Sequence, residues 1–451
     1  MNPDTTIAQA GELLRLLAKS PQAPRELVSA HLRGKKKLDA ATRAAISTLA
    51  FHALRALRFC HAAVTGEEQL ARTFDAEHAR RLLAASLLLA DAEMLPQPLP
   101  YATEEHADFA LAARRALPDH VGVLARALRL RVDAGSDAVA AATMASVPDW
   151  IFERWQHAWG DTAAALALGR ALLDAAPLTL RVNLQCMSRA ALIDALGAQG
   201  VEARAHPLLP AAVTLERRAR VMEGPLYEQG CFEVQDAGSQ LIGYALGEVA
   251  GRDVLDACAG GGGKTMHLLD RGGGSMRLAA SDSEAAKLRA LRMRAARLPL
   301  SLPETRALPP SGDVLEAFGE RRFDVILVDA PCSGLGTARR DPGLKWKLST
   351  STITRLAARQ YDILRRNAAL LRPGGMLLYA TCSLLPEENQ HVARRFLEEH
   401  DNFQPDALAP VFAAQGLAAL PLASMTHEFT VHPALLDSDG FYFARFRRNE
   451  H

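Results

Sequence analysis

The sequence predicts a multidomain protein that begins with an all-α bundle, continues with a small α+β module and ends with an α/β domain built on a parallel sheet. Three observations predict this architecture. The chain has 451 residues, too many for one compact core. Apolar residues recur at helical spacing up to about residue 140, and short apolar strands alternate with helices from about residue 235 onward. We therefore expect domains at residues 1–140, 148–232 and 233–451.

Composition and charge favour a soluble globular chain. Hydrophobic residues make up 49% and charged residues 23%, as in ordinary globular proteins. The 52 Lys and Arg residues against 51 Asp and Glu residues give a net charge of +1, so contact with a polyanion requires a local basic patch. The amino terminus lacks the pattern of a secretory signal. The six cysteines lack zinc-ligand spacing. We expect reduced thiols, a cytoplasmic location, no metal and no membrane contact.

Helical periodicity defines the first domain. Apolar faces are formed by Ala10, Leu13, Leu14 and Leu17, and by Ile46, Leu49, Ala50, Ala53, Leu54 and Leu57. No run alternates as a strand would, so we expect a helical bundle. A basic cluster lies between helices and is either a solvated loop or a phosphate-contacting patch: Arg33, Lys35, Lys36 and Lys37. Small residues from 135 to 148 indicate a domain junction.

The middle segment reads as a small α+β module. Residues 178–183, LTLRVN, alternate as a short strand does. A helix is expected near residues 189–199, and further short strands are expected up to residue 232.

Short apolar runs define the strands of the third domain, at residues 254–258, 278–282, 325–330 and 376–381. Continuous apolar strands that alternate with helices predict a parallel sheet covered on both faces. Ligands bind at the carboxyl ends of such strands. At those ends the sequence places Asp256, Asp282, Asp329, Cys332 and Cys382.

A glycine-rich turn, CAGGGGKT at residues 258–265, joins the first of these strands to a helix. Four successive glycines allow a tight turn and a close ligand approach, and the helix N-terminus offers free N–H donors. The turn is typical of a nucleotide-like ligand, and a tight turn without a ligand is the alternative. The dinucleotide fingerprint GxGxxG does not fit, whereas a phosphate-binding P-loop fails only at Cys258. A P-loop-like ATPase therefore stays open as a function.

Two aspartates are candidate cofactor contacts. Asp282 ends the second strand, where its carboxylate can accept hydrogen bonds from ribose hydroxyls. A helix cap is the alternative there. Asp313 precedes an apolar run, a position at which Asp often serves only as an N-cap.

Two cysteines follow the strands expected at residues 325–330 and 376–381. Taken singly, Cys332 and Cys382 each favour an inert core thiol. Together, beside an Asp and a cofactor turn, they fit methylation at carbon 5 of a pyrimidine. In that reaction a thiolate adds to carbon 6, a carboxyl near ring nitrogen 3 stabilises the adduct, and a base then removes the carbon 5 proton.

Residues 235–448 resemble the RNA cytosine-5 methyltransferases of the RsmB/Nop2/Sun family. The resemblance lies in VQDAGSQ, LDACAGGGGKT, VDAPCSGLGTARRDPGLKW, LLRPGG, YATCSLLPEEN and DGFYFARF. It implies a Rossmann-like class I methyltransferase domain that uses S-adenosylmethionine, with Cys382 as the nucleophile, Cys332 aiding release and Asp329 in the catalytic set. It implies cofactor contacts by Cys258, Ala259, Gly260, Gly261, Gly262, Gly263, Lys264, Asp282, Asp313 and Asp329.

The resemblance also implies an RNA substrate. Its RNA-facing residues are Arg339, Arg340, Lys345 and Trp346. The middle segment resembles an N1-type module, and the helical region resembles a NusB-like RNA-binding domain, particularly over residues 43–59. We therefore expect small-subunit ribosomal RNA as the partner, transfer RNA as the second choice, and a monomer. A DNA cytosine methyltransferase and an RNA-binding assembly factor without activity are the remaining alternatives.

The sequence departs from the family pattern at two places. Gly260 and Gly261 stand where the family has Ala and Pro, which we expect to leave the turn more flexible and to lower cofactor affinity. Gly343 stands where the family has Asp, which weakens one expected RNA contact.

Overall fold

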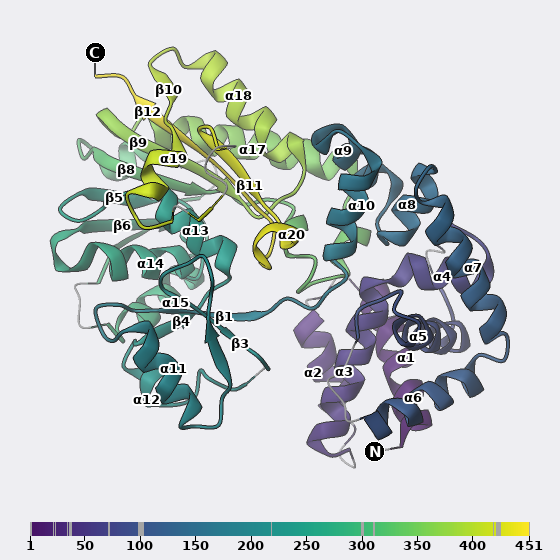
Figure 1. Ribbon diagram of the computed structural model, residues 1–451. Helices are drawn as coiled ribbons and strands as arrows, with labels where there is room; N and C mark the ends of the chain where they lie inside the picture. Colours follow the sequence, from purple (N-terminus) through teal and green to yellow (C-terminus); the bar gives the residue numbers. More distant parts are fainter. Residues whose placement is uncertain are drawn as a thin grey trace. The chain divides into compact units, whose positions relative to one another are not determined.

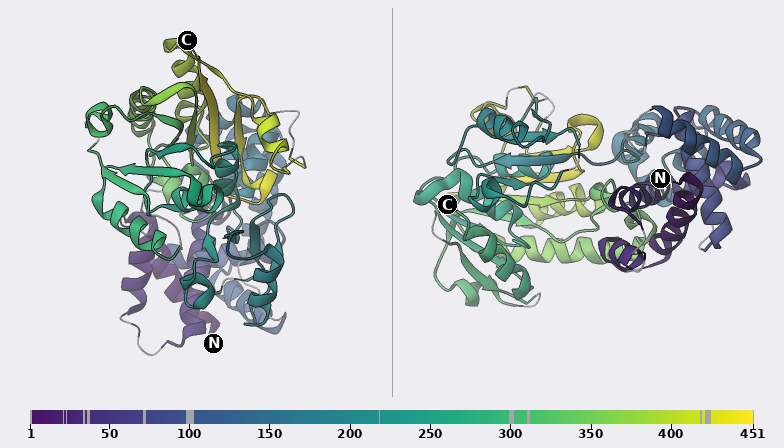
Figure 2. Two further views of the ribbon diagram at one scale, coloured as in Figure 1. Left: turned by 90° about the vertical axis from the view of Figure 1, so that its left-hand side faces the viewer. Right: turned by 90° about the horizontal axis from the view of Figure 1, so that it is seen from below.

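The computed structural model describes residues 2–450 apart from 21, 23, 34, 36–37, 71–72, 98–102, 218, 299–301, 310–311, 418 and 421–424. Contacts divide the chain into two compact units (Figures 1 and 2). The first comprises Met1–Ala175 with Thr337–Leu348, and the second Ala176–Gly336 with Ser349–His451.

The first unit is helical, as predicted. Its helices are α1 (Pro3–Lys19), α2 (Pro24–Arg33), α3 (Ala40–Arg55), α4 (Leu57–Thr65), α5 (Ala76–Asp91), α6 (Thr103–Ala116), α7 (His120–Asp133), α8 (Ala138–Met144), α9 (Asp149–Trp159) and α10 (Thr162–Ala171). Short polar side chains start several of them, because an oxygen of Asp39, Asp75 or Asp161 accepts a hydrogen bond from a first-turn amide. The expected apolar face that ends at Leu57 spans two helices, because α3 ends at Arg55 and Leu57 begins α4.

The boundary of the helical unit differs from the expected junction near residues 140–148. Helices α9 and α10 belong to this unit. The reason is close packing: a Cβ added at Gly169 of α10 would overlap the Ala145 side chain, and Trp155 of α9 is fully buried. Contacts also keep residues 176–336 in one unit, so the three-domain division stays a prediction.

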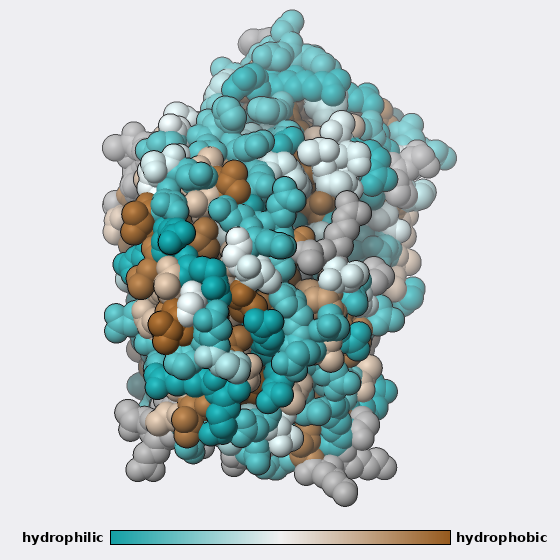
Figure 3. Space-filling model, turned by 90° about the vertical axis from the view of Figure 1, so that its right-hand side faces the viewer, coloured by the Kyte–Doolittle hydropathy of each residue, from teal (hydrophilic) through white to brown (hydrophobic). Residues whose placement is uncertain are grey.

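The exposed faces of the helical unit mix apolar and basic side chains. Val121, Leu128 and Val132 of α7 are exposed, with Arg129 and Arg131 between them. Figure 3, which faces the side of the molecule where Figure 1 draws α7 and α8, shows hydrophobic side chains scattered among hydrophilic ones.

The basic cluster near residue 35 is only partly described. Lys36 and Lys37 lie outside the described residues. Lys35 pairs with Glu12 of α1, with its ammonium 3.0 Å from the carboxylate. This lysine is therefore engaged within the helical unit.

The second unit begins with a four-stranded antiparallel sheet in the order β2-β3-β1-β4. Its elements are β1 (Leu178–Val182), α11 (Arg189–Gly197), β2 (Ala203–Ala205), β3 (Ala212–Leu215), α12 (Pro225–Glu228) and β4 (Phe232–Val234). This arrangement confirms the expected strand at 178–183 and the helix near 189–199. Leu180, Leu192 and Phe232 belong to its buried apolar cluster.

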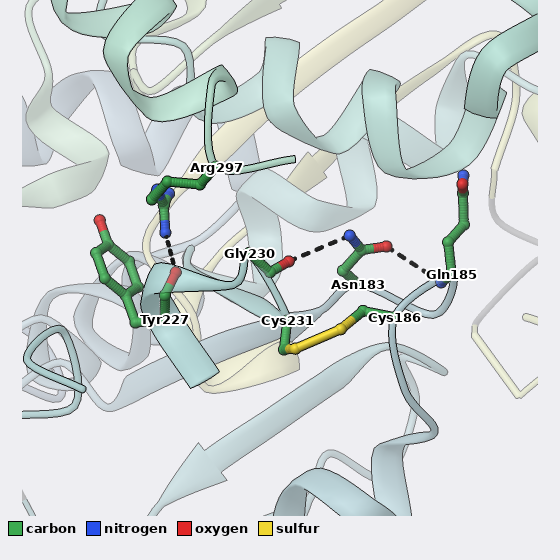
Figure 4. The surroundings of a disulfide bond; sticks show 7 residues. All are labelled: Asn183, Gln185, Cys186, Tyr227, Gly230, Cys231 and Arg297. Carbon is green, nitrogen blue, oxygen red and sulfur yellow. Dashed lines mark hydrogen bonds between the residues drawn. A yellow bond between two sulfur atoms is a disulfide. The ribbon is translucent and has the colours of Figure 1, made fainter. Parts of the chain in front are cut away.

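A disulfide joins Cys186 to Cys231 (Figure 4). The expectation that all six cysteines are reduced is therefore wrong for these two. The cause is tertiary: β1 and β4 pair antiparallel, with Val182 opposite Phe232, so cysteines 45 residues apart in the chain come within 5.3 Å between Cα atoms. Sequence spacing alone contains no sign of that pairing.

The main sheet of the second unit has the order β10-β12-β9-β8-β5-β6-β7, and β11 pairs with β12. Strands β9, β8, β5, β6 and β7 run parallel, whereas β12 is antiparallel to β9 and to β10. The strands are β5 (Asp253–Asp256), β6 (Arg277–Asp282), β7 (Glu304–Ala307), β8 (Phe323–Asp329), β9 (Leu371–Thr381), β10 (Phe403–Pro405), β11 (Glu428–Val431) and β12 (Phe441–Arg448).

Helices cover both faces of this sheet, which confirms the predicted α/β architecture (Figure 1). Alternate residues of one strand face opposite layers: Val254 of β5 lies in one core cluster and Leu255 in the other. The helices are α13 (Ala237–Ala245), α14 (Gly263–Gly272), α15 (Ala285–Ala295), α16 (Val314–Phe318), α17 (Thr350–Ala368), α18 (Gln390–Glu399), α19 (Leu408–Ala413) and α20 (Pro433–Leu436). Short 3-10 turns are η1 (Gly273–Ser275), η2 (Leu335–Thr337), η3 (Leu344–Trp346) and η4 (Pro386–Glu388).

Within the described ranges, no helix combines the length and the apolar character that crossing a bilayer requires. The same residues contain no cluster of His, Cys, Asp and Glu suited to hold a metal ion.

Candidate functional site

The glycine-rich turn follows β5 and leads into α14, as predicted. Gly260 and Gly262 have φ angles of +55° and +88°, a region that side chains disfavour. At Gly262 an added Cβ would lie 2.7 Å from the Leu291 side chain of α15. The Gly260 amide donates a hydrogen bond to the Asp282 carboxylate at 2.9 Å, and the Gly262 amide donates to the Ala259 carbonyl at 2.9 Å. The backbone conformation therefore favours glycine at two of the four positions, 260 and 262.

A cleft of about 280 Å³ opens beside this turn. It lies at the carboxyl ends of β5, β6 and β8, where the sequence predicted a ligand site. Its lining consists of Ala257, Cys258, Gly260, Ser281, Asp282, Ser283, Glu284, Lys287, Leu308, Pro309, Gly312, Val314, Asp329, Pro331, Arg359, Ile363, Arg366 and Asn367.

The residues of the cleft fit S-adenosylmethionine better than a polyphosphate. Leu308, Pro309 and Val314 supply apolar walls for a flat base, and Asp282 supplies a carboxylate for ribose hydroxyls. The Asp282 carboxylate accepts hydrogen bonds from the amides of Gly260 and Glu284, the latter at 2.8 Å. The Gly260 amide is one of the donors that a P-loop would offer to phosphate. A carboxylate in contact with the turn repels phosphate at that point, which weighs against the ATPase alternative even though Lys287, Arg359 and Arg366 also line the cleft.

Asp313 lies beside the cleft but serves as the N-cap of α16. Its carboxylate accepts hydrogen bonds from the amides of Leu315 and Glu316 at 2.8 and 3.4 Å. Its neighbours Gly312 and Val314 line the cleft. The capping alternative raised by the sequence is thus present in the structure, and a cofactor contact by Asp313 stays a prediction.

A buried carboxyl group and an ion pair adjoin the turn. Asp256 is fully buried and accepts a hydrogen bond from the Thr265 hydroxyl at 2.7 Å. Burial raises the pKa of Asp256 to about 7. The Lys264 ammonium lies 2.6 Å from the Asp329 carboxylate. Burial opposes its charge, but the nearby charge and hydrogen bond of Asp329 raise the pKa of Lys264 above its ordinary value. Lys264 therefore keeps its proton beside the cleft.

The two predicted thiols meet at the neighbouring edge. Strands β8 and β9 are parallel neighbours, with Asp329 opposite Ala380. The loops that follow them place Cys332 Sγ 3.3 Å from Cys382 Sγ, and both side chains are half-buried. The hydrogen bond with Cys382, together with burial, raises the pKa of Cys332 well above its ordinary value. Cys332 therefore stays protonated at neutral pH.

A carboxylate that the sequence did not single out supports both cysteine loops. Glu388 is fully buried and accepts hydrogen bonds from the Ser333 amide at 2.8 Å and the Gln360 side-chain amide at 2.9 Å. It also accepts hydrogen bonds from the hydroxyls of Ser333 and Ser383, each at 2.5 Å. Each serine follows one of the two cysteines. In the sequence, Glu388 is recognisable only as an acidic residue without an assigned role, six positions after Cys382 in the run YATCSLLPEEN.

The predicted RNA-facing residues divide by exposure. Arg339 and Lys345 are 3% and 2% exposed. The Lys345 ammonium donates to the Arg55 carbonyl at 2.7 Å, and Arg339 donates to the Ala175 carbonyl at 2.8 Å. Burial, with the charge of Arg55, lowers the pKa of Lys345 to about 7. The expectation that these two side chains face RNA does not fit this burial, because both bind the main chain of the helical unit.

The other two residues of that segment stay candidates for RNA contact. Arg340 is exposed, and Trp346 is half-buried with the Lys345 ammonium 5.3 Å from its ring centre.

Comparisons with known proteins match two family profiles, which together cover most of the second unit and the end of the first. Residues 244–447 match the profile of a family described as 16S rRNA methyltransferase RsmB/F. Residues 147–222 match the profile of an RsmF/B-like ferredoxin-like domain, which starts closer to the expected junction than the contact boundary does.

Similar proteins extend these matches. The "Ribosomal RNA small subunit methyltransferase B" of Xanthomonas campestris is 35% identical over 330 residues, 72% of each chain. The "Probable ribosomal RNA small subunit methyltransferase B" of Bacillus subtilis is 36% identical over 267 residues, 59% of each chain. The "Ribosomal RNA small subunit methyltransferase B" of Cronobacter sakazakii is 35% identical over 306 residues. The matched region spans 59% of the Bacillus protein's length and 65% of the Cronobacter protein's length. In these two relatives it therefore covers less than two thirds of the protein.

Solved structures show the fold. The crystal structure of PH0851 has a TM-score of 0.73 at 19% identity, and the match covers 99% of each chain. A methyltransferase homologue from Pyrococcus horikoshii has a TM-score of 0.56 at 24% identity, covering 69% of this chain and 98% of its own.

Proposed function

The chain belongs to the RsmB/F family of 16S rRNA methyltransferases, and from that membership we propose that it methylates carbon 5 of a cytosine in small-subunit ribosomal RNA. The family and the fold imply S-adenosylmethionine as the cofactor. When bound, this cofactor supplies an electrophilic methyl group. The cleft beside the glycine-rich turn is the place proposed for it, with Asp282 at the ribose and Leu308, Pro309 and Val314 around the base.

The proposal assigns the chemistry to the two thiols. Cys382 Sγ adds as a thiolate to carbon 6 of the cytosine, and the electron pair shifted onto carbon 5 takes up the methyl group. The bond between the methyl group and the sulfonium sulfur breaks, and that sulfur leaves as a neutral thioether. A base then removes the carbon 5 proton, the double bond re-forms, and Cys382 leaves. Asp329, which Lys264 holds at 2.6 Å, is proposed to stabilise the adduct near ring nitrogen 3.

The proposal gives Cys332 a role that begins after the adduct forms. Its pKa is high chiefly because of its hydrogen bond with Cys382. Once Cys382 Sγ is bonded to carbon, it is a poorer hydrogen-bond partner, so the largest cause of the high pKa of Cys332 is weakened while burial still acts on it. Cys332 can then lose its proton and serve as the base that assists elimination. The 3.3 Å separation of the two sulfur atoms is the observation that carries this proposal.

A trapping assay tests the assignment. The full chain and its variants are incubated with cofactor and small-subunit RNA, denatured and resolved by electrophoresis. Cys332→Ala is expected to accumulate a denaturant-resistant protein–RNA adduct, whereas Cys382→Ala is expected to lose both adduct and product. Cys60→Ala, which removes a buried thiol of the helical unit, is the control.

Each contrary result is informative. Adduct accumulation in Cys382→Ala instead would reverse the two roles and favour the DNA-type arrangement, in which the earlier cysteine attacks. ATP hydrolysis without methyl transfer would favour the P-loop alternative, and RNA binding without either would favour an assembly factor. Bisulfite sequencing of RNA from cells lacking the gene separates ribosomal from transfer RNA. A monomeric state and a cytoplasmic location stay predictions.

A further inference from the structure

The glycine-rich turn needs an outside restraint to keep one conformation. Four successive glycines have more backbone freedom to lose on ordering than other residues do. Gly260 forms part of the cleft wall, so disorder in the turn weakens that wall. The hydrogen bonds of the Gly260 and Gly262 amides hold part of the turn. A further contact comes from outside it.

That contact is made by Arg294 of α15. Its guanidinium donates to the Gly261 carbonyl at 2.6 Å and, through its other terminal nitrogen, to the Glu233 carboxylate at 2.7 Å. The Gly261 carbonyl and the Gly262 amide belong to one peptide plane, and the amide donates to Ala259. This plane is therefore held from both ends.

Glu233 lies on β4 of the small sheet and is itself well anchored. It is 4% exposed, and it also pairs with Arg297. Arg297 donates to the Tyr227 carbonyl at 2.6 Å and lies over the Tyr227 ring, 3.9 Å from its centre (Figure 4). A carboxylate with two arginine partners is rigid, and a forked guanidinium can bind an acid and a carbonyl at once.

We propose that Arg294, held by Glu233, is a positioning residue that orders the cofactor turn, so that affinity for S-adenosylmethionine depends on a strand of the small sheet. Arg294 does not line the cleft and acts through the Gly261 carbonyl. The inference rests on the proposed placement of the cofactor in this cleft.

The test measures S-adenosylmethionine binding by calorimetry in the full chain. Arg294→Ala is expected to raise the Kd about tenfold, because it removes a charge-assisted hydrogen bond to the turn. The KM for the cofactor rises with it, whereas kcat at saturating cofactor stays within twofold. Amide hydrogen exchange is expected to quicken at residues 258–263. Arg294→Lys keeps the charge for Glu233 but lacks the fork, and it is expected to show the same loss in a chain with native thermal stability.

Two arginines of the same region serve as matched controls. Arg292→Ala removes an exposed arginine of α15 and is expected to leave the Kd within twofold. Arg297→Ala removes the other partner of Glu233 without touching the turn, so it is expected to lower thermal stability while changing the Kd less than threefold. An equal loss of affinity in Arg297→Ala and Arg294→Ala would overturn the proposal.

A double-variant cycle with Gly261→Pro isolates ordering of the turn. Gly261 does not have a positive φ, and an added Cβ there meets nothing closer than 3.9 Å. A proline restricts the turn by itself, so the loss caused by Arg294→Ala is expected to be at least threefold smaller in the proline background. Equal losses in both backgrounds contradict the ordering role. If the unchanged chain does not bind the cofactor at all, the proposed function fails instead.

Discussion

Glu388→Ala should uncouple the two cysteine loops, and its cost can be worked from the hydrogen bonds at the carboxylate. The two hydroxyls of Ser333 and Ser383 lie 3.2 Å apart and can bond to each other. The Ser333 amide and the Gln360 side-chain amide have no such substitute and lose a buried acceptor. An unsatisfied buried donor costs about 1–3 kcal/mol, so the free energy of unfolding should fall by roughly 2–6 kcal/mol.

Urea unfolding measures this loss, and Glu388→Gln is the matched control. One oxygen, Oε1, accepts both N–H donors in the native chain, and a glutamine can keep that oxygen in place. The serine hydroxyls can rotate to accept from its amide. We expect the glutamine variant to lose less than about 1.5 kcal/mol.

The same pair of variants tests the link to chemistry. Misplacing a reacting group by about 1 Å can cost roughly a hundredfold in rate, so methyl transfer should fall about that much in Glu388→Ala and far less in Glu388→Gln. Disulfide formation between Cys332 and Cys382 with added diamide, which takes up the two electrons and two protons, should slow in parallel. An alanine variant that unfolds within about 1 kcal/mol of the native chain and couples its cysteines at the native rate would refute the reasoning.

Three further predictions concern charge and backbone conformation. Because the pKa of Asp256 is about 7 in the folded chain and lower when unfolded, the folded state binds more protons between about pH 4 and pH 7, and stability falls as the pH rises through that window. Thermal melts should therefore show Asp256→Asn gaining on the native chain from pH 4 to 7. The pH dependence of stability that Lys345 causes has the opposite sign. Its pKa in the folded chain, about 7, lies below the ordinary value, so native stability rises between about pH 7 and 10. Any advantage of Lys345→Met should shrink over that range, and a constant difference would contradict the burial argument. Gly262→Ala should weaken cofactor binding and cost about 1–2 kcal/mol of stability, whereas Gly263→Ala, where an added Cβ meets nothing within 4 Å, should be nearly neutral in both assays.

Local sequence patterns were sufficient to predict most helices and strands of the fold. The apolar runs at 325–330 and 376–381 lie in the parallel neighbours β8 and β9, and the glycine-rich run lies between β5 and α14. The helical bundle was visible from apolar spacing. Boundaries were less accurate, because the packing of Gly169 against Ala145, which holds α10 to the helical unit, leaves no local pattern.

Candidate site residues divide in the same way. Asp282 and the two thiols could be named from their places after strands, since parallel strands bring their carboxyl ends to one edge. The burial of Lys345 could not be predicted. A lysine beside a tryptophan is expected to be exposed, and the Arg55 carbonyl that binds its ammonium is distant in the sequence. The Cys186–Cys231 bond depends on the antiparallel pairing of β1 with β4.

The order of strands, turns and helices, and the residue types at their ends, were determined along the chain, because backbone preferences and apolar periodicity act over a few neighbouring residues. The 3.3 Å approach of two sulfur atoms, the buried Glu388 beneath them and the hold of Arg294 on the turn were decided only in three dimensions. Each joins residues at least 30 positions apart or depends on burial from several elements, and short-range preferences contain no information about such contacts.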